Sequence, residues 1–424
     1  WGFFPGVLAG WRISEENFWR SLSKTIPYLK LRASWGQMGN DQVYYGNVLK
    51  EYQYLSIYDF NNYAINGAAA TTLQENVVPN PNFTWEVANN SDVGLEGQLL
   101  DGKVNFELDY FLNKRNHILW QPQGSTPYSS GIATILPPEN IGKTENKGYE
   151  FLIGYTGHSG DFTYSISVNG GYAKNKILFY DEAPGAPAWQ RATGHPFGAS
   201  GSPYNGAAFL AYQYAGVFKD QKEIDANTVD YTGVTPSLKP GDMKFQDVDH
   251  NGKINGDDQV RLNKTQDPTF TGGVNLKVGW KGFDLSVLFQ GATGGLLYIG
   301  TESGDIGNYL QYSYDHQWTI DHPSSVDPRL ANRNNTYFTS GGTSLNTYFL
   351  RNSDYLRLKN VELGFNLPAN LLKRASLQNL RIYVSGLNLI TWDKMKIWDP
   401  ESTSGNGQYY PQARIINTGI RVTF

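Results

Sequence analysis

Residues 103–113 read KVNFELDYFLN, and along them apolar and polar side chains alternate one by one. Successive side chains of a β-strand point to opposite faces, so this alternation predicts a strand with one apolar and one polar face. The apolar face would carry Val104, Phe106, Leu108, Tyr110 and Leu112. The same period recurs in residues 162–172, 274–280, 283–289 and 416–424. The chain is therefore predicted to be all-β.

The connections between these predicted strands fall into two classes of length. Short joints lie at 99–103, 156–161 and 280–283, and two longer joints, 14–27 and 367–379, have room for a turn or two of helix. The remaining connections are long and comprise residues 37–90, 116–146, 174–270, 292–354 and 389–411. Long structureless loops are uncommon in compact soluble domains, whereas outer-membrane barrels combine short periplasmic turns with long extracellular loops. The pattern predicts a transmembrane antiparallel β-barrel with its long loops outside the cell.

The number of predicted strands, about eleven, narrows this prediction. The first and the last strand both run toward the end with short joints, as they would in one half of a barrel of about 22 strands. The alternation changes phase within 355–365, between Leu358 and Val361, which predicts a β-bulge near Lys359 or Asn360. We therefore expect about eleven strands from the C-terminal portion of a large transmembrane barrel.

The composition excludes several other classes of protein. Cysteine is absent, which removes disulfides and thiol catalysis, and a formal net charge of −4 gives no basic surface for nucleic acid. No run of 18 apolar residues occurs, so no transmembrane helix is predicted. Neither G-x-S-x-G nor H-E-x-x-H is present. No catalytic residue is predicted, and the protein is not expected to be an enzyme.

Residues 247–258, DVDHNGKINGDD, have the spacing of a calcium-binding loop. Such a loop places oxygen ligands at positions 1, 3, 5, 7, 9 and 12, with glycine at position 6 for the sharp turn. These ligand positions hold Asp247, Asp249, Asn251, the Lys253 carbonyl, Asn255 and Asp258. The flanking residues do not read as helices, so this is a loop motif and not a helix-loop-helix. We expect the loop to bind a structural calcium ion in one of the long outer connections. The alternative is a solvated acidic turn.

Several segments, taken in chain order, strongly resemble the SusC/RagA family of TonB-dependent outer-membrane transporters, which is of Bacteroidota type. They are GFFPGVLAGWRISEE (2–16), AGVFKDQKEI (215–224), KPGDMKFQDVDHNGKINGDDQ (239–259), YLRLKNVELGFNLP (355–368), RIYVSGLNLITWDKMKIWDPE (381–401) and YYPQARIINTGIRVTF (409–424). The resemblance extends over essentially the whole chain. It implies an outer-membrane location in a Gram-negative bacterium.

The resemblance also implies a function. Members of this family import oligosaccharides or peptides, use energy delivered by TonB, and are covered by a SusD-like lipoprotein that acts as a lid. Residues 1–424 would then be the C-terminal portion of the barrel, and the plug domain and signal peptide are expected to lie outside this chain. The alternative from the residues alone is a secreted all-β glycan-binding or adhesion protein that contains calcium. In that protein the apolar strand faces would pack against a second sheet.

Overall fold

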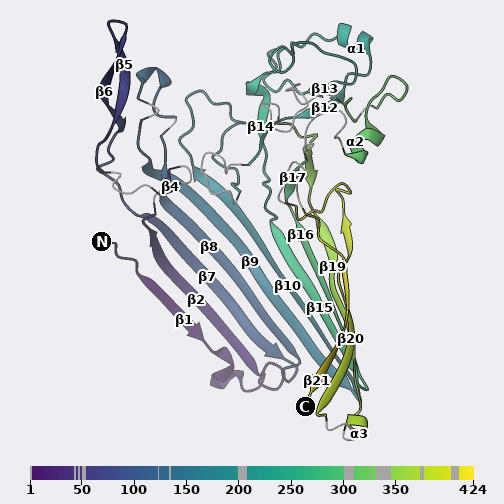
Figure 1. Cartoon of the computed structure of the whole chain (residues 1–424). Coiled ribbons are helices and arrows are strands. Elements are labelled where there is room, and N and C mark those ends of the chain that lie inside the picture. The colour runs from purple at the N-terminus through teal and green to yellow at the C-terminus, as the bar shows by residue number, and fades with distance from the viewer. Residues whose placement is uncertain are drawn as a thin grey trace.

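The computed structural model describes residues 2–42, 44–45, 48–49, 54–122, 124–132, 135–198, 208–299, 310–324, 326–330, 345–372, 377–402 and 410–424. Eleven strands form one antiparallel sheet, which curves from β1 at one edge to β21 at the other (Figure 1). In their order across the sheet they are β1 (Gly6–Trp11), β2 (Tyr28–Asn40), β7 (Glu86–Leu99), β8 (Val104–Trp120), β9 (Glu139–Ser159), β10 (Phe162–Phe179), β15 (Phe270–Trp280), β16 (Phe283–Thr293), β19 (Tyr355–Asn366), β20 (Asn379–Asp393) and β21 (Ile415–Thr423). The predicted fold class is confirmed, and so is the predicted number of strands.

Turns at one end of the sheet are as short as the sequence predicts. Lys281 and Gly282 alone join β15 to β16, with φ values of 46° and 90°. Two consecutive residues with positive φ are typical of the hairpin turn that matches the twist of the flanking strands. The longer joints contain the 3₁₀ turns η1 (Ile13–Glu15) and η2 (Asn17–Trp19) and the short helix α3 (Ala369–Leu372). We call this end of the sheet the short-turn end, and the opposite end the long-loop end.

Residues paired directly across neighbouring strands lie on the same face of a sheet. One such row consists of Val104, Tyr155, Ile166, Leu276, Val287, Val361, Gly386 and Ile416. The next row, on the opposite face, consists of Thr156, Ser165, Lys277, Ser286, Glu362, Ser385 and Asn417. The sheet therefore has an apolar outer face and a polar inner face, as the period-two pattern predicts.

The apolar face is open to its surroundings. Ile166, Leu285 and Leu363 are 39%, 37% and 46% exposed. The other sheets formed by the described residues have two strands each, and those labelled in Figure 1 lie toward the long-loop end. Exposed apolar surface of this extent is what a strand of a membrane barrel presents to lipid. The alternative of two sheets packed face to face is wrong.

The alternation change within β19 is a bulge, as predicted. Pairing with β20 shifts between Leu358 and Asn360, and pairing with β16 shifts between Leu288 and Phe289. The strand ends differ from prediction, because β8 continues to Trp120 and β9 begins at Glu139.

The predicted loop at 116–146 is accordingly shorter, at residues 121–138. Strands likewise extend into the predicted loops at 37–90, 174–270 and 389–411. Backbone hydrogen bonds continue through residues that have no apolar alternation, and side-chain patterns do not detect them. β9 has 21 residues, whereas about 9–11 suffice to cross a membrane, so its sheet extends beyond the bilayer.

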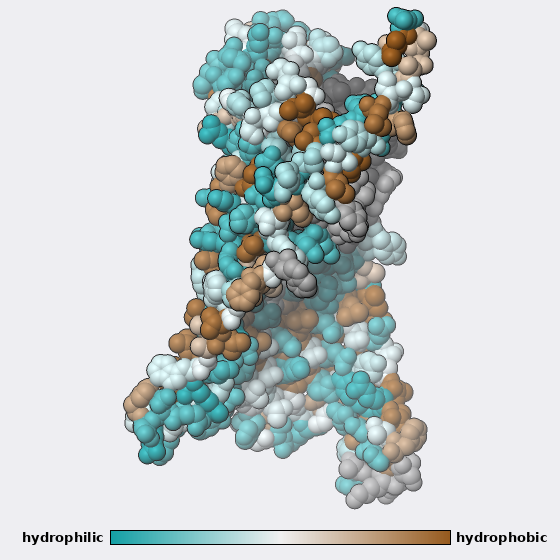
Figure 2. All heavy atoms as spheres, turned by 90° about the vertical axis from the view of Figure 1, so that its left-hand side faces the viewer, coloured by the Kyte–Doolittle hydropathy of each residue, from teal (hydrophilic) through white to brown (hydrophobic). Residues whose placement is uncertain are grey.

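The long-loop end carries the remaining elements (Figure 1). They are β3 (Tyr44–Tyr45), β4 (Val48–Leu49), β5 (Ile57–Ile65), β6 (Ala68–Val77), η3 (Tyr128–Ser130), β11 (Leu210–Tyr212), β12 (Tyr214–Val217), α1 (Gln221–Asp225), β13 (Met243–Phe245), η4 (Gly256–Asp258), β14 (Gln259–Arg261), β17 (Leu296–Tyr298), α2 (Gln311–His316) and β18 (Leu350–Asn352). Hydrophilic residues predominate at this end, at the top of Figure 2. No helix in the described part of the chain is long and apolar enough to span a membrane.

Two connections join at the long-loop end into one folded unit. Its buried core consists of Tyr212, Phe218, Tyr231, Val234, Met243, Phe245 and Ile254, with Tyr348 and Phe349 packed against it. Residues 208–262 of the β10–β15 connection form what we call the first outer segment. The described residues within 310–330 and 345–349 of the β16–β19 connection form the second outer segment. Together the two segments are the outer module.

Candidate functional site

The inner face carries ordered rows of polar side chains. One row, on β7 to β10, consists of Asn90, Asn113, Asn146 and Asn175. The Asn175 side chain donates to the Phe197 carbonyl at 2.6 Å and accepts from the Phe197 N–H at 2.9 Å. Such amides supply both donors and acceptors to whatever lies along this face.

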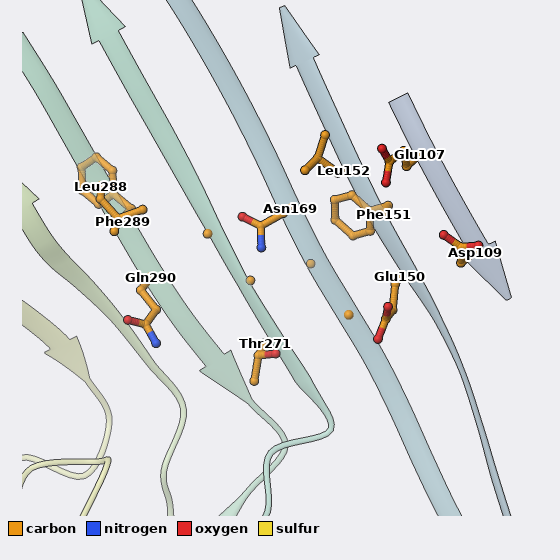
Figure 3. Close-up of a pocket in the computed structure, with 14 residues that line it drawn as sticks. Glu107, Asp109, Glu150, Phe151, Leu152, Asn169, Thr271, Leu288, Phe289 and Gln290 are labelled. Carbon is orange, nitrogen blue, oxygen red and sulfur yellow. The ribbon is translucent and has the colours of Figure 1, made fainter. Parts of the chain in front are cut away.

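The inner face is hollowed where β8, β9, β10, β15 and β16 run side by side (Figure 3). The hollow has a volume of about 560 Å³. Its floor includes the glycine pairs 170–171 and 272–273, which contribute no side chains beyond Cα. The polar side chains that line it are Glu107, Asp109, Glu150, Asn169, Thr271 and Gln290. The arrangement of carboxylates and amides suits hydrogen bonding to a polar solute.

The carboxylates of the hollow differ in their partners. Asp109 accepts from Arg32, with Nη2 2.5 Å from each carboxylate oxygen. Glu107 and Glu150 form no ion pair with any described residue.

A buried arginine organises the inner face at β19 and β20. Arg357 is 1% exposed, and its Nη2 lies 2.8 Å from Asp399 while its Nη1 pairs with Glu401. Its Nε donates to Thr391 at 2.9 Å, and the Tyr355 hydroxyl donates to Glu401 at 2.8 Å. A buried charge persists only when it is paired, so this network holds residues 399–401 against the sheet. Sequence reasoning missed it, because its partners lie on separate segments.

The acidic loop, residues 247–258, lies in the first outer segment, and backbone amides bend it around its own carboxylates. Asp247 accepts from the N–H groups of Gly252 at 2.9 Å and Asn251 at 3.1 Å. Asp249 accepts from the same Asn251 N–H at 3.0 Å. Gly252 has a φ of 78°, the left-handed conformation that glycine adopts without strain. The sharp turn at position 6 is therefore present as predicted.

Asp258 closes the loop from inside the module. It is fully buried and accepts from the Val248 N–H at 2.7 Å and the Asn255 N–H at 2.9 Å. Ile254, at 0% exposed, belongs to the module's core and anchors the middle of the loop. Burial of one carboxylate and one apolar residue shows that this loop is a folded part of the module and not only a solvated turn.

The aspartates of the loop converge as a cation site requires. Oxygens of Asp247, Asp249 and Asp258 all lie within 4.8 Å of one another. Calcium binds oxygen at 2.3–2.6 Å, so oxygens around one ion lie at most about 5 Å apart, and the observed group fits that limit. Hard oxygen ligands of this kind suit calcium better than zinc or copper.

The other three predicted ligands lie in the same loop and take part in its turns. The Asn251 side-chain oxygen accepts from the Lys253 N–H at 2.8 Å, and that of Asn255 accepts from the Asp257 N–H at 2.7 Å. An amide oxygen has two lone pairs, so the bond from Lys253 leaves one on Asn251 for a cation. The Asn255 oxygen also accepts from the Asp258 N–H in a capping box. The Lys253 backbone lies beside Asp230 in an isolated bridge.

The charge state of the loop favours a cation. Partial burial acts to raise the pKa of Asp247, but hydrogen bonds from Gly252 N–H and its neighbours outweigh this effect. The pKa of Asp247 therefore lies below its ordinary value of 3.8. Burial, with Asp258 nearby, raises the pKa of Tyr212 to about 12, so this core phenol stays neutral. The Asp247 carboxylate is thus ionised and available to a cation at neutral pH.

Comparison with known proteins identifies the relatives of this chain. Residues 1–281 match the family model described as TonB dependent receptor-like, β-barrel. The chain is 30% identical to TonB-dependent receptor P26 of Formosa agariphila, over 100% of this chain and 42% of that protein. It is 25% identical to TonB-dependent receptor SusC of Bacteroides thetaiotaomicron, over 100% of this chain and 40% of that protein. The chain thus spans about two fifths of the length of these relatives.

A solved structure shows the same fold. The RagAB peptide transporter matches with a TM-score of 0.70 at 24% identity, over 99% of this chain and 43% of that chain. The RagAB peptide importer in its open-open state matches with a TM-score of 0.71 at 23% identity, over 99% of this chain and 42% of that chain. The eleven-stranded sheet therefore corresponds to part of a larger barrel.

The faces, turns and curvature described above define a wall of a transmembrane β-barrel. The matching family places such a barrel in the outer membrane of a Gram-negative bacterium. The chain belongs to the TonB-dependent receptor-like β-barrel family, and within it is SusC/RagA-like. This is a family of transporters and not of enzymes. The family resemblance stated from sequence is thereby confirmed.

Proposed function

We propose that this chain is the C-terminal barrel portion of a TonB-dependent importer of oligosaccharides or peptides. The observation that carries the proposal is the match along the whole chain to SusC-like receptors, combined with a polar inner face. Carboxylates and amides on that face hydrogen-bond equally well to sugar hydroxyls and to peptide groups. A SusD-like lipoprotein at the long-loop end and energy from TonB complete the proposed system, as the resemblance of the sequence to the SusC/RagA family implies.

Uptake by whole cells tests this proposal with the full-length protein. A strain without the gene would be given a fluorescent peptide digest of casein and, separately, a fluorescent oligosaccharide mixture. We expect the full-length gene to restore uptake of one of these probes, and deletion of TonB to abolish it. Restoration of neither probe would contradict import of these classes. Co-purification of the tagged receptor with the lipoprotein encoded by a neighbouring gene would test the lid.

We further propose that the acidic loop binds a structural calcium ion at the long-loop end. Asp247, Asp249 and Asp258 would supply carboxylate oxygens, and Asn251, the Lys253 carbonyl and Asn255 the remaining ligands. The convergence of the carboxylates and the turn at Gly252 support this proposal. If the long loops lie outside the cell, a site with a dissociation constant of about 0.1–1 mM would be filled there.

Calorimetry on the full-length protein tests calcium binding. We expect one heat of binding that the Asp249→Ala variant loses and that Asp257→Ala retains, because Asp257 occupies a position without a ligand role. Equal binding by the wild-type protein and the Asp249→Ala variant would contradict the assignment. Anomalous scattering at the loop from crystals grown with calcium would locate the ion directly.

A further inference from the structure

Both ends of the acidic loop continue directly into short strands. β13 enters the loop and pairs with β12, while β14 leaves it and pairs with β11. β11 and β12 are consecutive, with only Gln213 between them, and the Gln213 carbonyl accepts from the Gln246 N–H at 3.0 Å. The loop therefore connects β13 to β14, and these two strands pair with neighbouring parts of one extended segment, residues 210–217. Its conformation determines how β13 and β14 are placed against that segment.

The other edge of the same segment holds the second outer segment. The Tyr212 N–H donates to the Leu345 carbonyl at 2.9 Å, and the Thr347 N–H donates to the Tyr212 carbonyl at 3.0 Å. The Tyr214 N–H donates to the Thr347 hydroxyl at 2.9 Å. β11 thus lies between β14, which follows the acidic loop, and residues 345–347.

Besides these hydrogen bonds, the shared apolar core also connects the acidic loop to the second outer segment. Ile254 of the loop packs with Tyr212 and Met243 at 0%, 4% and 0% exposure, respectively. Tyr348 and Phe349 pack against the same cluster. A shift of Ile254 would leave a gap in the core against which these two aromatic side chains pack.

A further contact lies just before β13. The Asp242 carboxylate is 2.7 Å from Arg329 Nε, and the Arg329 N–H donates to the Gly241 carbonyl at 2.9 Å. Trp318 Nε1 donates to the Lys219 carbonyl at 3.2 Å. Both long connections are therefore held together around the short strand that leads into the loop.

We propose that a cation in the acidic loop controls the docking of the second outer segment. Without the cation, three carboxylates within 4.8 Å repel one another and the loop opens, which loosens β13, β14 and the Ile254 anchor. With the cation bound, β13 and β14 stay paired with β12 and β11. The other edge of β11 then keeps the conformation in which it hydrogen-bonds to residues 345–347. This regulation rests on the calcium site proposed above. It makes the two longest connections respond to calcium as one body.

Hydrogen exchange on the full-length receptor in detergent tests the coupling. Exchange would be followed in peptides covering 247–258, 345–349 and, as an internal reference, β8, with calcium chloride or with EDTA. At calcium concentrations about 100 times the dissociation constant, we expect up to about 100-fold slower exchange in the loop and in 345–349. Exchange in β8 should not change.

Matched variants separate the coupling from the calcium site. Asp249→Asn removes one ligand charge and should abolish the calcium effect at both places, whereas Asp257→Asn, the same change at a position without a ligand role, should retain it. Protection of 247–258 without protection of 345–349 would overturn the coupling and leave the calcium site standing. No calcium effect anywhere would overturn both. Protection of 345–349 that persists in Asp249→Asn would overturn the coupling as well.

Discussion

The sheet and the outer module bury their apolar residues in opposite directions. In the sheet, Ile166 and Leu363 face outward at 39% and 46% exposure, and the polar side chains face inward. In the outer module, Ile254 and Met243 are fully buried at 0%. The two regions therefore suit different solvents. Lipid covers the apolar face of the sheet, whereas water surrounds the module.

This difference shows which part of the molecule can change shape independently. The sheet is stabilised by continuous backbone hydrogen bonds between neighbouring strands. Its outer apolar side chains contact lipid and do not form a buried core. The module is held by one small core, by backbone hydrogen bonds and by the ion pair between Asp242 and Arg329 of the two outer segments. Small, locally stabilised units are the ones that open without global unfolding, so responses to ligands are expected in the module rather than in the sheet.

The largest effect is expected from a cavity in the core of the module. Ile254→Ala should cost about 2–5 kcal/mol of the module's stability, since Ile254 is fully buried and its neighbours cannot fill the space. Hydrogen exchange should rise throughout residues 208–262 and stay unchanged in β8. A rise in exchange that also included the sheet would show that the two regions are not independent.

A charge on the outer face of the sheet tests the opposite region. Ile166→Arg should cost up to roughly 2–4 kcal/mol in lipid vesicles, since the arginine would face hydrocarbon on the outer face of the sheet. Ser167→Arg is the matched control, because Ser167 is the next residue on β10 and faces inward. The folded fraction in a urea series measures both variants. Equal losses would contradict the assignment of the two faces.

The ion pair between the outer segments should have a smaller effect that depends on pH. Arg329→Met leaves the Asp242 carboxylate, 1% exposed, without its guanidinium partner and should cost about 1–3 kcal/mol at pH 7. Burial already raises the pKa of Asp242 even with Arg329 present. Because a raised carboxyl pKa means that the folded state binds the proton more tightly, stability of the variant should recover as the pH falls through that pKa.

Thermal unfolding of the module at several pH values measures this recovery. Asp242→Asn combined with Arg329→Met is the control, because it has no carboxylate to protonate and should show no recovery at low pH. A loss in Arg329→Met that did not vary with pH would contradict the assigned role of the buried charge.

The smallest effect is expected at the rim of the module. Lys244 pairs with Glu223 in a partly exposed position, and this hydrogen bond lowers the pKa of Glu223. Lys244→Met should therefore cost only about 0.2–1 kcal/mol. A lowered carboxyl pKa contributes stability above the unfolded pKa and loses it as the pH falls, so the variant and the wild type should converge in acid. Unfolding curves at neutral and acidic pH compare them, and a loss as large as that of Arg329→Met would contradict this ranking.

Local patterns predicted the sheet well and the strand ends less well. Alternation identified both faces, the eleven strands and the bulge between Leu358 and Asn360. It placed the end of β8 too early. Backbone pairing continues to Trp120, although the side chains near this end no longer alternate between apolar and polar. In the acidic loop, spacing alone predicted which carboxylates meet, since a loop of this length brings its own residues together.

By itself, the sequence determined the two-faced strands, the short turns and the acidic loop, since each depends on residues close together in the chain. Only the tertiary structure decided that Arg357 is buried among two carboxylates, that the inner face is hollowed across β8 to β16, and that two long connections share one core. Asp242 and Arg329 are 87 residues apart. Contacts over such separations depend on how strands and loops are arranged in space, and no local period encodes them.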